Sequence, residues 1–364
     1  MPSIFDQFHL GPHGLRNRLV MAPMTRSRAV SHDPDDDTVL YYAQRASAGL
    51  IITEGTPISE EGRGYAYTPG IYSAAQVEGW RRVTDAVHDR GGAIFCQLWH
   101  VGRQSHVSLQ PGGRLPVSSA AVAANVEVWG FDANGNAISV PASVPRPLET
   151  GEIARVVAGI VAAAGNAMEA GFDGVEIHAA NGYLFEQFIN GALNTRTDRY
   201  GGSVENRLRF VLEALDAITQ AIGELRTGIR VAPFGRFGDM HSYPDEEATW
   251  LAVAEAFSKR TLAYVHLSDQ ETLGAEAIPA GFVDKFRAHY SGNLILAGGF
   301  EKQTAQAALD AGRAELIAIG RPFIANPDLV ERYRNDWPVE TPDRALFYTG
   351  GKRGYVDYLP YQAS

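Results

Sequence analysis

The chain has 364 residues, of which 45% are hydrophobic and 20% are charged, as expected for a globular protein with a large core. Its net charge of −10 is spread along the sequence, which argues against a nucleic-acid partner because phosphate binding needs a basic patch. The single cysteine, Cys96, excludes an intrachain disulfide and an iron–sulfur cluster held by this chain alone. No apolar run approaches 18 residues and the N-terminus lacks the features of a secretory signal, so we expect a cytoplasmic protein that does not span a membrane.

Short apolar runs alternate with helical patterns along most of the sequence. Eight runs are predicted to be strands, at residues 18–22, 50–54, 93–99, 174–178, 229–233, 263–267, 294–297 and 316–319. The clearest helices, with apolar residues at three- and four-residue spacing, are expected at residues 73–90, 150–170, 204–222, 245–260 and 302–311. This alternation predicts an α/β protein with one (β/α)₈ TIM barrel over residues 1–364. A doubly wound open sheet is the alternative, but the G-x-G-x-x-G turn of its dinucleotide-binding form is absent.

Three segments fall outside the alternation. Residues 101–148 form an excursion after the third strand, and an Asn-Gly turn between residues 126–129 and 137–140 predicts a hairpin within it. The acidic run at residues 33–37 is expected to be a solvated loop. The Gly- and Tyr-rich stretch 347–358 is expected to pack either over the barrel mouth or along its side.

Glycine-rich turns follow the last two predicted strands. They contain Gly298, Gly299 and Phe300 in one case, and Gly320 and Arg321 in the other. Exposed N–H groups of such turns can hold an anion, and an arginine adds a fixed charge. Barrels frequently bind phosphate at these two loops, so a phosphate site is predicted. Tight turns with a structural ion pair are the alternative.

Three hydrogen-bonding side chains follow the fourth predicted strand. His178 and Asn181 can both donate to one substrate oxygen and polarise it. The phenol of Tyr183 can protonate a carbanion without being ionised at rest. A buried structural histidine and a helix-capping asparagine are the alternative for the first two residues, but the three together favour a catalytic site.

Polar residues also lie in or after other predicted strands. Arg230 is costly inside a barrel strand unless it meets an anion, such as a reduced flavin, or a carboxylate across the barrel. Gln97 can donate and accept at the pyrimidine edge of a flavin, and Thr25 can donate to its O4 edge. Four aromatic residues either line a substrate pocket or simply pack: Tyr65, Trp99, Phe237 and Tyr348.

Other catalytic constellations are missing from the sequence. It contains no H-E-x-x-H motif, no clustered Cys and His residues and no G-x-S-x-G elbow, so we expect no metal site and no serine hydrolase. A flavin-free barrel lyase or aldolase is a rival reading, but no lysine lies at the end of a predicted strand. A non-catalytic flavin-binding protein is a further rival, which the His178–Asn181–Tyr183 set opposes.

The segments as a whole resemble the Old Yellow Enzyme family of flavoproteins, over most of the chain. The stretch from His178 to Leu184 is the most specific match. The other matching segments are residues 17–26, 42–46, 50–55, 97–103, 194–198, 200–207, 320–321 and 326–329.

The resemblance implies FMN as a tightly bound, non-covalent cofactor. Pro23, Met24 and Thr25 would line its ring, with Thr25 bonding O4, while Gly55 and Gln97 would contact the polar edge. It also implies Arg230 beside N1 and O2, and a phosphate held by residues of the two glycine-rich turns: Gly298, Gly299, Phe300, Gly320 and Arg321. Threonine at position 25 is similar to the larger branch of the family, and another branch has cysteine there.

The implied reaction is ping-pong reduction of an electron-poor alkene activated by a carbonyl or nitro group. NADPH or NADH would reduce FMN and leave, with NADPH favoured by the resemblance alone. Hydride would then pass from flavin N5 to the β-carbon, with His178 and Asn181 holding the activating oxygen and Tyr183 protonating the α-carbon. Reduction of nitrate esters or nitroaromatics at the same site is the alternative.

Parts of the chain depart from the family pattern. Residues 354–360 have Val356 where threonine is commoner and an additional Leu359, and residues 234–244 match poorly. Both regions border the pocket in the family, so substrate range and stereochemistry stay open. The choice between a monomer and a homodimer also stays open.

Overall fold

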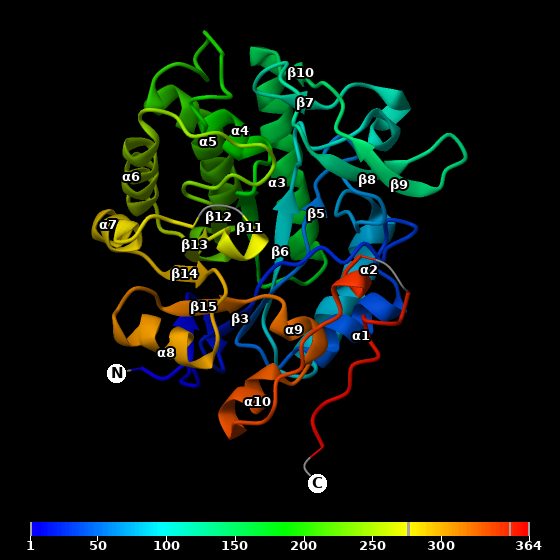
Figure 1. The fold of residues 1–364 in the computed structure, drawn as a ribbon, viewed down its shortest axis with the longest axis vertical. Helices are drawn as coiled ribbons and strands as arrows, with labels where there is room; N and C mark the ends of the chain where they lie inside the picture. The colour runs from blue at the N-terminus through cyan, green and yellow to red at the C-terminus, as the bar shows by residue number, and fades with distance from the viewer. Residues whose placement is uncertain (1, 275–276, 349–350, 363–364) are drawn as a thin grey trace.

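The computed structural model describes residues 2–274, 277–348 and 351–362, and its centre is a closed barrel of eight parallel strands (Figure 1). Around the barrel the order is β3, β4, β6, β11, β12, β13, β14 and β15, and β15 pairs with β3 to close the ring. All eight predicted strands are confirmed, with ends shifted by a few residues. Their bounds are β3 (Leu19–Met21), β4 (Leu50–Ile52), β6 (Ile94–Trp99), β11 (Gly174–Ala179), β12 (Thr227–Val231), β13 (Tyr264–Ser268), β14 (Leu294–Ala297) and β15 (Leu316–Ile319).

Helices pack around the outside of these strands (Figure 1). The five predicted helices are confirmed as α2 (Ala74–His88), α3 (Ile153–Glu169), α5 (Val204–Ile222), α6 (Glu246–Ser258) and α8 (Lys302–Asp310). The remaining α-helices of the described residues are α1 (Asp36–Gln44), α4 (Leu184–Ile189), α7 (Phe282–His289), α9 (Pro322–Ala325) and α10 (Leu329–Asn335). Single 3₁₀ turns are η1 (Val107–Leu109), η2 (Pro111–Gly113), η3 (Thr150–Glu152), η4 (Glu224–Arg226), η5 (Glu271–Leu273) and η6 (Arg344–Leu346).

The inside of the barrel has a core of its own at the end where the strands begin. An N-terminal hairpin of β1 (Phe8–Leu10) and β2 (His13–Leu15) contributes Leu10 and Leu15 to a buried cluster with Phe95 and Tyr264. Packed apolar side chains therefore close this end, which leaves the carboxyl ends of the strands as the place for a ligand.

The excursion after β6 contains the predicted hairpin. β8 (Glu127–Phe131) pairs antiparallel with β9 (Ala137–Pro141), and Figure 1 shows this ribbon projecting from the body of the molecule. Three short strands complete the sheet structure: β5 (Thr56–Pro57) beside β6, and β7 (Val117–Ser118), which pairs parallel with β10 (Arg146–Pro147).

The acidic run at residues 33–37 is not a solvated loop throughout, so that prediction is wrong. Its second half begins helix α1, because the Asp35 carboxylate accepts the N–H of Thr38 at 2.9 Å and caps the helix. Asp36 and Asp37 then occupy the first turn, where negative charge is favoured by the helix dipole.

One helical stretch bears on the expectation that no apolar run approaches 18 residues. Among the described residues, one helical stretch, Thr150–Glu169, is long and apolar enough to cross a membrane by length and composition, with a mean hydropathy of 1.2. Its residues Ile153, Val156 and Ile160 are buried in the layer between the barrel and its helices. Glu152, Arg155 and Asn166 interrupt the stretch, so it contains no unbroken apolar run of 18 residues.

Candidate active site

The predicted site residues gather at the carboxyl ends of the strands. A cavity of about 420 Å³ opens there. All four aromatic residues named for a substrate pocket line this cavity, and substrate binding among them stays a prediction. The lining consists of Thr25, Ser27, Tyr65, Trp99, Glu127, Val128, Trp129, Ser139, Tyr183, Phe237, Ala345 and Tyr348.

His178, one residue before the end of β11, is held as a neutral imidazole. Its side chain is 4% exposed, and burial followed by the charge of Arg230 lowers its pKa well below 6.5. The backbone N–H of Ala180 points at Nδ1 from 3.4 Å, so Nδ1 acts as the acceptor. The ring proton therefore lies on Nε2, which leaves one neutral N–H donor.

Asn181 adopts the left-handed conformation, with φ of 58°, in the turn after β11. Asparagine tolerates this conformation better than most residues. Its backbone carbonyl accepts the amide of Gln104 at 2.7 Å, and its Oδ1 accepts the amide of Gln270 at 3.0 Å. Since the oxygen is taken, the Nδ2 group remains available to donate.

Tyr183 is packed in a group of aromatic rings. Its ring meets that of His178 edge-on at 4.8 Å between centroids and that of Trp99 edge-on at 5.1 Å, and the Tyr65 ring stacks on Trp99. Burial, followed by the neighbouring Tyr65 phenol, raises the pKa of Tyr183 well above 10. Tyr183 is therefore protonated over the whole neutral range and can act as a proton donor.

Arg230 lies on β12 inside the barrel. Its Nη2 donates to the Ser268 hydroxyl at 2.9 Å, while its buried Nε has no hydrogen-bond partner in the described parts of the chain. The predicted alternative was an ion pair between Arg230 and a carboxylate across the barrel. Burial lowers the pKa of Arg230, and Glu176, on the neighbouring strand β11, opposes that shift through its charge but does not form an ion pair with Arg230.

Gln97 and Glu176 form a buried polar pair below this mouth. The Gln97 amide donates to Glu176 at 2.7 Å, and His266 Nδ1 contacts the other carboxylate oxygen at 2.8 Å. One amide hydrogen of Gln97 is thereby committed, and its carbonyl oxygen and second hydrogen remain for a ligand.

These observations fit FMN, the cofactor implied by the sequence. An unpartnered, buried guanidinium N–H suits the electron-rich N1 and O2 edge of a flavin, and the fixed amide of Gln97 suits its pyrimidine rim. Pro23, Met24 and Thr25, directly after β3, are each only partly buried. Thr25 also lines the cavity, so a ring lying between Thr25 and Arg230 would border it.

Gly55 follows β4 and lies under the Trp99 ring. A Cβ at this position would sit 2.6 Å from Cε3 of Trp99, so no larger residue fits without displacing the indole. The structure therefore explains Gly55 by packing, and its predicted contact with the flavin edge stays a prediction.

The predicted phosphate loops follow β14 and β15. Gly298 has φ of 153° and lies against Asp269, where a Cβ would approach the Asp269 Cβ to 2.5 Å. Gly299 is left-handed as well, so the backbone turns sharply with exposed N–H groups. Arg321 lines a second cavity of about 500 Å³, and Gly320 lies beside Met24. Phosphate binding by these loops stays a prediction.

The C-terminal segment, residues 344–348 and 351–362, separates the two cavities. Ala345 and Tyr348 face the first cavity, while Arg344 and Phe347 face the second. Within the stretch 347–358, Tyr348 lies at the mouth, whereas residues 351–358 pack along the side against helix α1, so each of the two predicted positions holds for a part of it; residues 349 and 350 lie outside the described residues. Tyr355 is stacked on Tyr41 of α1, at 4.3 Å between ring centroids.

Two buried arginines hold the C-terminal segment in place. Arg26 donates to the carbonyl oxygens of Phe347 at 3.0 Å and Gly354 at 2.7 Å. Arg28 donates to those of Leu346 at 2.8 Å and Gly351 at 2.9 Å. The cationic groups thus bind backbone atoms of the segment and do not enter the cavity.

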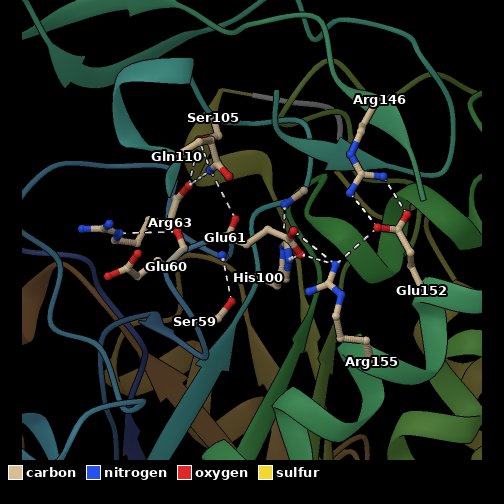
Figure 2. Close-up of polar contacts among 12 residues, drawn as sticks. Ser59, Glu60, Glu61, Arg63, His100, Ser105, Gln110, Arg146, Glu152 and Arg155 are labelled. Carbon is tan, nitrogen blue, oxygen red and sulfur yellow. Dashed lines mark hydrogen bonds and ion pairs between the residues drawn. The ribbon is translucent and has the colours of Figure 1, made fainter. Parts of the chain in front are cut away.

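A charged cluster fixes the loop that carries Tyr65 (Figure 2). Arg155 of α3 donates to Glu61 at 3.0 Å, and His100 Nε2 lies 3.7 Å from the same carboxylate. Burial opposes the ionisation of Glu61, but His100 and Arg155 outweigh it and lower the pKa of Glu61 to about 2. The cluster ties this loop to the end of β6, next to Trp99.

The sequence analysis missed several residues that shape this site. Two of them, Gln270 and Gln104, contact Asn181, and a third, Glu176, contacts Gln97. These three therefore act through residues that the sequence had identified. Glu176 was detectable, because it alternates with His178 along one strand and so shares the inward face. Nothing in the sequence distinguished Gln104, Glu127, Trp129 or Ser139, since their roles depend on how the excursion folds over the mouth.

Comparisons with known proteins agree with this geometry. Residues 3–340 match the family model described as the NADH:flavin oxidoreductase / NADH oxidase family. A putative 12-oxophytodienoate reductase 11 from Oryza sativa subsp. japonica is 42% identical over 98% of this chain and 96% of its own length. A probable flavin mononucleotide-dependent alkene reductase from Leishmania infantum is 43% identical over 96% of this chain and 95% of its own length.

Solved structures give the same result. Morphinone reductase in complex with tetrahydroNAD superposes with a TM-score of 0.96 at 45% identity, covering 100% of this chain and 98% of that chain. The old yellow enzyme homologue from Zymomonas mobilis gives a TM-score of 0.93 at 40% identity, covering 99% of this chain and 100% of that chain. The chain belongs to the Old Yellow Enzyme family of FMN- and NAD(P)H-dependent oxidoreductases.

Proposed function

We propose that this enzyme reduces the C=C bond of α,β-unsaturated carbonyl or nitro compounds bound in the 420 Å³ cavity. The observation that carries the proposal is that two hydrogen-bond donors, His178 and Asn181, lie at the end of β11 with the protonated phenol of Tyr183, whose ring meets that of His178 at 4.8 Å between centroids and lines the cavity. FMN, when bound, supplies the redox chemistry, taking a hydride from NADH or NADPH and giving it to the β-carbon of the alkene.

The roles of His178 and Asn181 follow from their free hydrogen atoms. Nε2–H of His178 and the Nδ2 group of Asn181 would both donate to the activating oxygen of the substrate. Charge develops on that oxygen as the β-carbon accepts a hydride, so these donors stabilise the transition state more than the ground state. A neutral His178 also avoids placing a second cation beside Arg230.

The role of Tyr183 is to complete the addition. Its phenol would donate a proton to the α-carbon on the cavity side, and its high pKa keeps that proton available. The Trp99, Tyr65 and Phe237 side chains would exclude water from the reacting carbons and hold the substrate flat.

Replacing Tyr183 separates the two half-reactions. Tyr183→Phe should slow alkene reduction by about 10²-fold or more, the usual contribution of a positioned proton donor, and leave FMN reduction by NADH or NADPH nearly intact. Stopped-flow absorbance of the bound flavin measures both rates with 2-cyclohexenone as the alkene. Equal loss of both half-reactions would refute the assigned role. Product analysis with a nitrate ester tests the alternative activity at the same site.

A further inference from the structure

Gln270 lies just after β13 at the carboxyl mouth of the barrel and is 1% exposed. No step of the proposed chemistry uses its side chain. Its amide oxygen accepts the backbone N–H of Arg236 at 2.7 Å and that of Phe237 at 2.8 Å. Its amide nitrogen lies 3.0 Å from Oδ1 of Asn181.

The two backbone contacts determine which way the amide of Gln270 faces. A backbone N–H can only donate, so the Gln270 oxygen must face Arg236 and Phe237, and its nitrogen must face Asn181. The nitrogen in turn can only donate, so it selects the oxygen of the Asn181 carboxamide. The orientation of Asn181 is therefore fixed by two N–H groups that belong to a different loop.

We infer that Gln270 is a positioning residue that turns the NH₂ group of Asn181 toward the substrate. With this orientation Asn181 faces the substrate only as a donor, so it suits substrate oxygens that accept hydrogen bonds, such as carbonyl and nitro oxygens. The inference rests on the proposed role of Asn181 in binding that oxygen.

The same amide connects the donor to the wall of the cavity. Phe237, whose N–H binds the Gln270 oxygen, lines the cavity, and its loop contains Phe234 at φ of 59° and Gly238 at φ of 73°. Arg103 holds the far side of this loop through the carbonyl oxygens of Gly238 at 3.2 Å and Asp239 at 2.6 Å. Gln270 therefore sets the position of the cavity wall and the direction of the Asn181 donor together.

Gln270→Glu isolates the orienting effect. A carboxylate can still accept the N–H groups of Arg236 and Phe237, but it offers Asn181 an acceptor in place of a donor. Asn181 should then turn its NH₂ toward the new carboxylate and its oxygen toward the cavity. At pH 9, above the pKa of about 8 that burial gives Glu186, the new carboxyl group is ionised, and we expect the Kd of 2-cyclohexenone for the oxidised holoenzyme, measured from the flavin absorbance without NAD(P)H, to rise at least tenfold. FMN content and the unfolding temperature should change little.

Asn181→Ala provides the second arm of the experiment. In that background Gln270→Glu should change the Kd of 2-cyclohexenone less than twofold, because there is no carboxamide left to orient. An unchanged Kd in Gln270→Glu, or an equal tenfold loss in the Asn181→Ala background, overturns the inference. If Asn181→Ala alone binds 2-cyclohexenone as tightly as the parent enzyme, the proposed role of Asn181 fails first, and the inference fails with it.

Discussion

Burial sets the protonation state of His178 and Tyr183, the two titratable groups proposed to act on the substrate. It lowers the pKa of His178 and raises the pKa of Tyr183, so the pair consists of a neutral imidazole and a neutral phenol. The buried carboxylate of Glu176 lies on the same inward face of β11, where it orients Gln97 and acts on Arg230. The orientation of Gln97 and the electrostatic environment of Arg230 thus depend on Glu176, which lies below the mouth of the barrel.

The rate of the alkene half-reaction should vary little with pH between 6.5 and 10. His178 titrates below this range and Tyr183 above it, so both keep their active forms throughout. Stopped-flow oxidation of the reduced enzyme by 2-cyclohexenone measures this rate. An inflection inside the range that disappears in Tyr183→Phe would mean that the phenol ionises at a much lower pH than its burial implies.

At the residue scale, sequence motifs identified the groups proposed to touch substrate, but not the residues that contact those groups only after folding. His178, Asn181 and Tyr183 stand within six positions of one another in the sequence. Gln270 is 89 positions from Asn181, and only the three-dimensional fold brings the two amides together. An isolated glutamine after a strand carries no signal, because its role depends on which of its two amide atoms meets which partner.

The β8–β9 hairpin forms one wall of the cavity and contributes a charged side chain to the cavity lining. Among the described residues that line the cavity, Glu127 is the only one with a charged side chain, and the Ser139 hydroxyl donates to it at 3.0 Å. A 2′-phosphate is normally bound by a cationic side chain. An anionic wall is therefore better suited to NADH than to NADPH, in contrast to the preference implied by the family resemblance.

The enzyme should favour NADH, and Glu127→Gln should reduce that preference. Two unit charges about 4 Å apart in water repel by about 1 kcal/mol, so we expect a roughly fivefold or greater shift in the ratio of kcat/KM values toward NADPH. Steady-state kinetics with both coenzymes at low ionic strength measures the ratio. Glu255→Gln, an exposed acid on α6, is the matched control and should leave it unchanged.

The regular elements were predictable because their patterns are strong. The eight barrel strands are buried on both faces, so several of them read as near-continuous apolar runs, and polar residues such as Gln97 and Arg230 interrupt the others. Helix α1 was misread because capping and first-turn acids look the same as the acids of a loop. The hairpin was predictable from its Asn-Gly turn, but its contact with the cavity was not, since that depends on packing over the mouth.

For the molecule as a whole, buried carboxylates make stability depend on pH. Burial raises the pKa of Glu186 to about 8 and that of Glu54 to about 7, so the folded protein keeps protons that the unfolded chain releases above pH 4.5. The folded state binds more protons in this window, so stability falls as pH rises toward 8. Glu61 acts in a lower window, where its stabilising contribution is lost as pH falls from 4.5 to about 2.

Glu186→Gln should stabilise the holoenzyme at pH 8 but not at pH 4.5. The amide oxygen can still accept the N–H of Gly182, as the carboxyl does at 2.7 Å, without the cost of ionisation. The gain is bounded by about 5 kcal/mol at pH 8. Thermal unfolding at both pH values measures it. A difference in unfolding temperature that is independent of pH would show that Glu186 is not the group responsible.

The hold of Arg26 and Arg28 on the C-terminal segment has a consequence for how this enzyme can diversify. Both guanidinium groups bind carbonyl oxygens, which every amino acid possesses. The path of residues 346–354 is therefore held largely through main-chain atoms, while Tyr355 anchors the residues that follow on Tyr41. Selection can exchange Tyr348 or Ala345, and so reshape the pocket, while the chain continues to follow the same course across the barrel.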